Sequence, residues 1–197
     1  AYLAHDPGAN TSGDFFHLGT LCAQDGRHEK SHAAFVRSLS AAKDREAALK
    51  RIYRHFRSQK QHTRFLSFMQ HLEGTALAVP GKDMALARCY LDMDQLFLAR
   101  QTLARIMDTR PAGEAAFLLA VIASKEKDWD AMEVLSHQAT RLEPYNAGYH
   151  FLFAQALNHR KKYANAENAV TRAIDLAPEE NAGYHKFRNQ VRQHLEK

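Results

Sequence analysis

Every 33 or 34 residues this chain repeats itself, and that period constrains its fold more than any other feature. Pro111, Pro144 and Pro178 are separated by 33 and 34 residues, and the string NAGYH occurs at 146–150 and again at 181–185. A fixed period of this length is typical of repeat proteins, in which each unit buries its apolar face against its neighbours. The sequence therefore predicts an array of similar units.

Residues 147–180 show what one unit contains. Two apolar series follow the 3.6-residue period of a helix, and they are Phe153, Ala154 and Leu157, then Tyr163, Ala166, Val170 and Ala173. The polar residues 159–162 between them predict a turn. Pro178 ends the second helix because proline cannot donate to the helical hydrogen-bond ladder. The unit is therefore predicted to be a hairpin of two helices, and Ala154 and Ala166 allow the two to approach closely.

This 34-residue hairpin resembles the tetratricopeptide repeat (TPR). The family's pattern of large, small and aromatic positions falls here on His150, Phe153, Ala154, Leu157, Tyr163, Ala166, Val170, Ala173 and Pro178. The match is tightest in the second helix, whereas in the first His150 replaces the usual tryptophan. The resemblance implies an all-α fold, a right-handed α-solenoid of antiparallel helix hairpins that form a TPR-like superhelix.

Copies of the pattern cover nearly the whole chain. The predicted repeats are 12–45, 46–79, 80–112, 113–146 and 147–180, followed by a C-terminal capping helix at 181–197. The copy at 46–79 is the most divergent, since Tyr53 and Phe65 replace small residues, and we expect its helices to lie further apart or to cross differently. Residues 1–11 resemble the end of a second helix, which indicates a truncated preceding repeat and a fragment of a longer chain.

Composition excludes some classes of protein. The chain is 45% hydrophobic and 25% charged, as globular proteins are, and it has no run of about 18 apolar residues that a membrane helix needs. Cys22 and Cys89 are too far apart for a CxxC motif, so no structural disulfide is expected. These features leave the compartment open, with the cytoplasm favoured over the periplasm, and they leave the oligomeric state open.

The common motifs of serine nucleophiles and of nucleotide binding are missing. The sequence contains no nucleophile elbow (GxSxG), no phosphate-binding loop and no dinucleotide-binding fingerprint (GxGxxG). Its 12 histidines include the i, i+4 pair of His28 and His32 in the string HEKSH, and this pair lacks convincing further ligands. We therefore expect no enzymatic activity, no metal and no cofactor.

A basic stripe is the main candidate site. The resemblance implies that first helices line a concave groove, and Lys50, Arg54 and Arg57 lie there at i, i+4 and i+7, with Arg88 from the next repeat potentially adjacent. Residues 1–79 hold 11 Lys and Arg against 7 Asp and Glu, so the basic excess is local. Guanidinium groups suit carboxylates or phosphates. A solvated basic face is the alternative interpretation.

The second candidate set has a different character. Phe117 and Phe151 occupy the same repeat position, and Gln155 and Asn158 lie one and two turns beyond Phe151. Exposed aromatic rings in a groove are useful peptide anchors, but rings at this spacing also suit packing between repeats. The basic stripe looks somewhat like the carboxylate clamp of some TPR domains, although Phe16 stands where that clamp needs Asn or Lys.

Together these features predict a non-catalytic scaffold for protein–protein interaction. Its concave groove would bind an acidic or acidic-apolar peptide through Lys50, Arg54, Arg57, Arg88, Phe117, Phe151, Gln155 and Asn158. One alternative is an accessory segment of a larger enzyme or of a membrane-associated bacterial assembly for secretion or surface polysaccharide. Another is an RNA-binding helical-repeat module, which is less favoured because the basic residues concentrate in one repeat instead of recurring in each.

Overall fold

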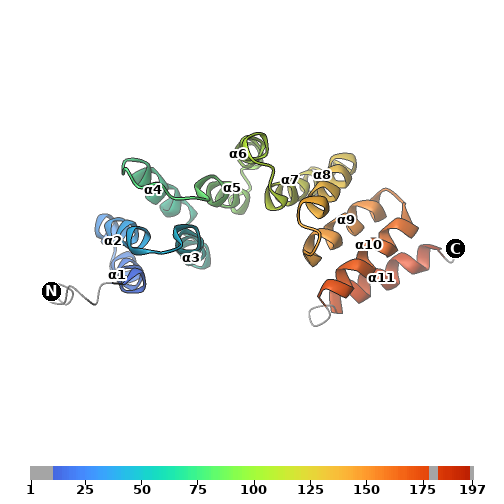
Figure 1. The fold of residues 1–197 in the computed structure, drawn as a ribbon, viewed down its shortest axis with the longest axis horizontal. Coiled ribbons are helices and arrows are strands. Elements are labelled where there is room, and N and C mark those ends of the chain that lie inside the picture. The colour runs from blue at the N-terminus through green and yellow to red at the C-terminus, as the bar shows by residue number, and fades with distance from the viewer. Residues whose placement is uncertain (1–10, 178–181, 196–197) are drawn as a thin grey trace. The chain divides into compact units, whose positions relative to one another are not determined.

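The chain is described by a computed structural model that covers residues 11–177 and 182–195. These residues form eleven α-helices and no strand (Figure 1), which confirms the all-α prediction. The helices are α1 (Ser12–Gln24), α2 (His28–Ala41), α3 (Arg45–Ser58), α4 (His62–Glu73), α5 (Lys82–Asp92), α6 (Leu96–Thr109), α7 (Gly113–Lys125), α8 (Trp129–Leu142), α9 (Ala147–His159), α10 (Tyr163–Leu176) and α11 (Ala182–Leu195).

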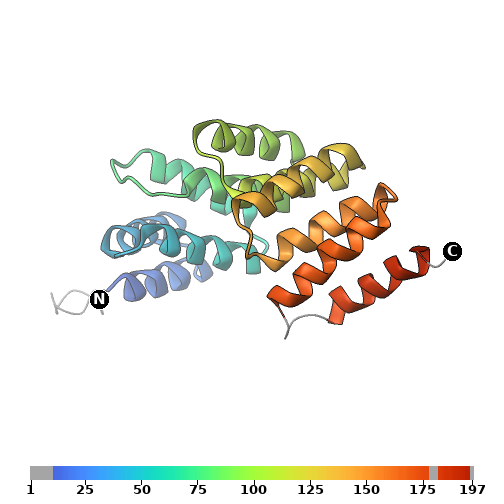
Figure 2. The same ribbon diagram turned by 45° about the vertical axis from the view of Figure 1, so that its right-hand side comes forward.

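The chain divides into two compact units, and the boundary in the sequence falls between Gln95 and Leu96, inside the predicted repeat 80–112. In the first unit α1 packs along α2, and α3 contacts α1, α2, α4 and α5. In the second unit α7 packs along α8 and α9 along α10, while α8 contacts α9 and α10 contacts α11. Figure 2 shows α1 and α2 lying side by side as an antiparallel hairpin in the first unit, and α9 and α10 doing so in the second.

The repeat period also appears in the backbone, at the turn between the two helices of each hairpin. Positive φ angles of 55–74° occur there at Gly26, Lys60, Asp94, Lys127 and Lys161, which are 33 or 34 residues apart. After each of them the next N–H donates to the carbonyl five residues back, as in the 2.8 Å bond from Arg27 N to Cys22 O. This arrangement is a Schellman motif, which ends a helix and reverses the chain. Glycine is the residue that adopts a positive φ most easily, but four of the five positions are not glycine. The residue type at these positions therefore does not explain why the same geometry recurs along the array.

Side-chain caps fix several helix starts. Thr11 and Asp14 form a capping box at α1, and the Asp44 carboxylate accepts from Ala47 N at 2.9 Å at the start of α3. Such caps satisfy amide groups that have no partner within the helix. Because Asp44 is the cap, α3 begins at Arg45, one residue before the predicted repeat 46–79. The predicted truncated repeat at 1–11 lies, apart from Thr11, outside the described residues, as does the predicted stop at Pro178.

Large aromatic rings fill the core of the first unit. Phe35, Phe56, Phe65 and Phe68 are all at most 2% exposed, and the rings of Tyr53 and Phe65 have centroids 4.9 Å apart. Interhelical distance grows with the side chains at the contact. Accordingly, α3 and α4 approach each other less closely along their lengths than α1 and α2 do.

Small residues and one recurring aromatic pair build the second unit. Ala120, Ala123, Ala139, Ala154, Ala166 and Ala173 are fully buried, which allows close helix approach. Each copy of NAGYH contributes a tyrosine that packs on a phenylalanine of the preceding hairpin. Phe117 stacks on Tyr149 with centroids 5.0 Å apart, and Phe151 packs on Tyr184 at 4.4 Å. The repeated string therefore marks the junction between successive first helices.

Candidate functional site

The cations of α3 lie on its solvent-exposed side because its other side is apolar. Leu49, Ile52 and Phe56 are buried in the core of the first unit, and Lys50, Arg54 and Arg57 are exposed. The periodicity of a single amphipathic helix therefore determines where the basic stripe lies.

A cleft of about 280 Å³ lies between α3 and α5 in the first unit. Its lining brings together Lys50, Arg54, Arg57 and Arg88, the first four residues of the predicted groove. Glu46 is the only carboxylate among the residues that line this cleft, and Leu49, Tyr53, Met84 and Ala85 add apolar surface. The cleft therefore combines cations with an apolar wall.

Of the three cations on α3, Lys50 and Arg57 are already paired. Lys50 Nζ lies 2.8 Å from Glu46 Oε1, and Arg57 Nε lies 2.7 Å from Asp92 Oδ2. Within the described part of the chain, Arg54 has no carboxylate partner, and its Nε lies 3.4 Å from the carbonyl oxygen of Lys50. Arg54 is therefore the cation of α3 whose charge a ligand can use without displacing a carboxylate.

Asp92 holds one side of the cleft in place. Its Oδ2 accepts a 2.5 Å hydrogen bond from the Tyr53 hydroxyl in addition to pairing with Arg57. Burial, followed by this carboxylate, raises the pKa of Tyr53 above its usual range, so the hydroxyl stays a donor. Sequence reasoning missed Asp92, although its position four residues after Arg88 places both on one face of α5.

Cys89 lies close to this network, and its thiol is unreactive. Burial and the neighbouring Asp92 raise the pKa of its thiol to about 12. Its Sγ lies 3.6 Å from the carbonyl oxygen of His62. A thiol with so high a pKa is a poor nucleophile, so its role is in packing.

The other four predicted groove residues lie in the second unit. Phe117 and Phe151 are engaged by Tyr149 and Tyr184, and Phe151 also meets Phe187 edge-on at 5.3 Å. Both rings thus pack between successive helices instead of standing free. Gln155 and Asn158 are partly buried on α9, and Asn158 Oδ1 is buried without a hydrogen-bond partner in the part of the chain that the structure describes.

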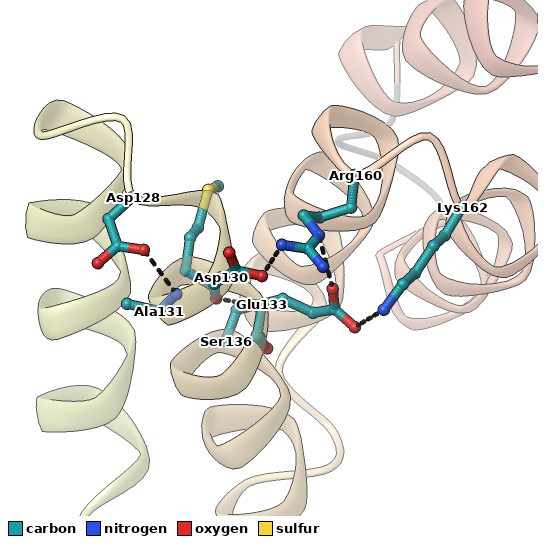
Figure 3. A network of polar contacts seen from close by, with 8 residues as sticks. Asp128, Asp130, Ala131, Glu133, Ser136, Arg160 and Lys162 are labelled. Carbon is teal, nitrogen blue, oxygen red and sulfur yellow. Dashed lines mark hydrogen bonds and ion pairs between the residues drawn. The ribbon is translucent and has the colours of Figure 1, made fainter.

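A second charged cluster, between α8 and the turn after α9, contrasts with the cleft (Figure 3). Arg160 pairs with Asp130 and lies 3.8 Å from Glu133, and Lys162 Nζ lies 2.6 Å from Glu133 Oε1. Next to them the rings of Trp129 and His159 stack with centroids 3.9 Å apart. Here opposite charges compensate each other across a repeat junction, so the cluster joins two hairpins and offers no excess charge to a ligand.

Histidines in the first unit pack against rings. His32 contacts Phe68 at 5.8 Å and His71 at 5.6 Å between ring centroids. Among the described residues, no group of three or more His, Cys, Asp or Glu side chains is arranged to hold a metal ion. Within the same residues, none of the helices combines the length and apolar character needed to cross a membrane.

Solved structures share this fold, while no family model matches the sequence and no curated protein matches it. A thermophilic TPR protein of Thermus thermophilus is 16% identical, with 95% of this chain and 100% of that one covered and a TM-score of 0.63. YrrB, a TPR protein with an unusual peptide-binding site, is 14% identical, with 88% and 90% covered and a TM-score of 0.59. Yeast Tom70 is 12% identical with a TM-score of 0.70, and 96% of this chain spans 42% of it. The chain therefore has the fold of TPR proteins.

Proposed function

We propose that this chain is a non-catalytic scaffold whose first unit binds an acidic-apolar peptide segment of another protein in the cleft between α3 and α5. One observation carries the proposal. Four cations from two helices, Lys50, Arg54, Arg57 and Arg88, converge on one cleft whose lining contains a single carboxylate. An excess of one charge at a hollow surface favours a ligand of the opposite charge and speeds its association.

The apolar wall indicates why the ligand is a peptide instead of a simple anion. Met84 is partly exposed and offers a surface for one aliphatic side chain beside the cations, while the buried Leu49 and Ala85 lie at the wall beneath. Binding sites commonly pair such an apolar contact with a few charged groups that fix orientation. YrrB, which shares the fold, is itself a TPR protein with a peptide-binding site, and this supports a similar use of the fold here.

The cations contribute differently to binding. Arg54 can offer a guanidinium fork to a ligand carboxylate in two parallel hydrogen bonds. Lys50 must exchange Glu46 for the ligand, so its net gain is small, as for exposed ion pairs generally. Arg57 is paired with Asp92, which orients it and compensates part of its charge. Arg54 should therefore be the most sensitive position.

Charge reversal at Arg54 tests the proposal. In the full chain, Arg54→Glu should weaken binding of a fluorescein-labelled acidic peptide about 10- to 100-fold, since a hydrogen bond between charged groups contributes roughly 1.5–3 kcal/mol. The matched control is Arg172→Glu, which makes the same change on an exposed position of α10 in the second unit. Fluorescence anisotropy measures the affinity, and circular dichroism confirms equal helicity.

Two outcomes would contradict the proposal. Equal affinity of the two variants for the acidic peptide would show that the cleft is a solvated face. Stronger binding of single-stranded RNA than of any acidic peptide, with affinity falling steeply as salt rises, would favour the nucleic-acid alternative.

A further inference from the structure

A second cleft, of about 330 Å³, lies on the other side of α3 from the cleft just described. Its lining includes Ser12 at the start of α1, Lys43 and Asp44 before α3, and Ala47, Arg51 and Arg54 on α3. Arg54 is the one residue that lines both clefts. The two clefts are therefore neighbours, and the exposed ridge of α3 separates them.

Helix geometry places the clefts on two flanks of that ridge. With 3.6 residues per turn, Ala47 and Arg51 lie on one side of Arg54, whereas Tyr53 and Arg57 lie on the other. The helix contacts support this placement of the clefts, because α3 contacts α1 as well as α5. A ligand chain that crosses α3 over Arg54 therefore enters both clefts.

Arg51 gives the second cleft an uncompensated charge. Its guanidinium lies 4.4 Å from the ring centroid of Phe16. Its Nη2 makes long contacts of 3.3 Å to the carbonyl oxygen and to Oγ of Ser12, and of 3.4 Å to Ser38 Oγ. Over the described residues its Nε has no acceptor and it forms no ion pair. A partly buried cation without a carboxylate is unfavourable by itself, so an incoming anion stabilises it.

The remaining charged residues of the second cleft also favour an anionic ligand. Lys43 is exposed and has no carboxylate partner among the described residues. The Asp44 carboxylate is engaged as the cap of α3, accepting from Ala47 N at 2.9 Å. Lys43, Arg51 and Arg54 thus face one carboxylate that already has a structural role.

We infer that the second cleft binds a second acidic side chain of the same peptide, three residues along the chain from the first; this inference rests on the proposed function of the first cleft. A helix with its side chains is about 10–12 Å across. A peptide in the polyproline II conformation advances about 3.1 Å per residue with three residues per turn, so residues i and i+3 point the same way and lie about 9 Å apart. Three residues therefore carry the chain from one flank of α3 to the other. The recognised pattern is an acidic residue at i and another at i+3.

A substitution at Ala47 tests the second cleft without harming the fold. Ala47 is exposed, lines only the second of these two clefts and is the third residue of α3. Glutamate is favourable in the first turn of a helix, and a carboxylate at this position lies at i, i+4 from Arg51 and neutralises it. Ala47→Gln is the matched control, because it fills the same volume without a charge.

The probes are three labelled peptides of Ala, Ser and Leu with acetylated and amidated ends, so that only side chains carry charge. They contain one Glu, two adjacent Glu, or two Glu at i and i+3. The full chain and the Ala47→Gln variant should bind the i, i+3 peptide about five- to tenfold more tightly than either other peptide. Ala47→Glu should remove that advantage and leave affinity for the one-Glu peptide within about twofold.

The outcomes separate the two proposals. If the full chain binds the one-Glu and i, i+3 peptides equally, the second subsite is overturned while the first cleft stands. If adjacent glutamates bind as tightly as spaced ones, the register across α3 is wrong. If none of the three peptides binds, the proposed function itself fails, and the inference fails with it.

Discussion

Glycine at the turn between α7 and α8 should stabilise the second unit. Lys127 occupies this turn with φ of 61°, a conformation that is unfavourable for residues with a Cβ atom. Its side chain is exposed and forms no ion pair among the described residues. Lys127→Gly therefore relieves backbone strain without removing a contact, and the free energy of unfolding should rise.

The magnitude follows from two opposing effects. The left-handed conformation costs a residue other than glycine about 1–2 kcal/mol, and the greater freedom of glycine in the unfolded chain offsets about 0.5–1 kcal/mol of this. The net gain is about 0.5–1 kcal/mol. Gly26 shows the same turn with the residue that suits it, at φ of 74°, and a Cβ there meets nothing within 4 Å. Gly26→Ala should accordingly lose a similar amount without any clash.

Urea unfolding followed by circular dichroism measures both changes as shifts of the transition midpoint at constant slope. Lys127→Ala is the control, because it removes the same side chain but keeps the Cβ and its strain. The reasoning is refuted if Lys127→Gly is no more stable than Lys127→Ala. The reasoning is also refuted if the Gly26→Ala variant is as stable as the unmodified chain.

Two further predictions concern the aromatic core of the first unit. Burial lowers the pKa of His32, aided by His71 and His28, and burial also lowers the pKa of His55. As pH falls below about 6.5, the unfolded chain therefore binds more protons than the folded chain, and the first unit should lose stability. Urea midpoints at neutral and mildly acidic pH measure this loss, which should shrink in His55→Leu, and an unchanged pH dependence would contradict it. Gly19→Ala should destabilise the first unit by about 1–3 kcal/mol, since the new Cβ would lie 2.5 Å from the fully buried Phe35 ring; thermal melting equal to that of the unmodified chain would show that the ring can move aside.

The sequence was sufficient to predict the fold because its evidence is local. Small residues such as Ala154 and Ala166 define the close side of each helix within one or two turns. The period then extends a single hairpin to the whole chain. The large residues Tyr53 and Phe65 also predicted helices at 46–79 that lie further apart or cross differently, and in the structure α3 and α4 contact each other over less of their lengths than α1 and α2 do.

The candidate site was harder to predict because contacts between hairpins decide it. Phe117 and Phe151 had two interpretations, and the choice depends on Tyr149 and Tyr184, which lie more than thirty residues away. The pairing of Arg57 with Asp92 depends likewise on how α5 docks on α3. Helical periodicity fixes which side of a helix is exposed, but it does not fix which neighbour meets that side.

The tyrosine of NAGYH makes each junction of the second unit a copy of the one before. Phe117 on Tyr149 and Phe151 on Tyr184 are the same join, used twice. If segment 147–180 were duplicated in tandem, each copy would therefore find the same Phe–Tyr pairing at both of its junctions, and no new interface would be needed. Such an array can grow or shrink by whole modules under gene duplication and deletion, while the clefts of the first unit stay untouched.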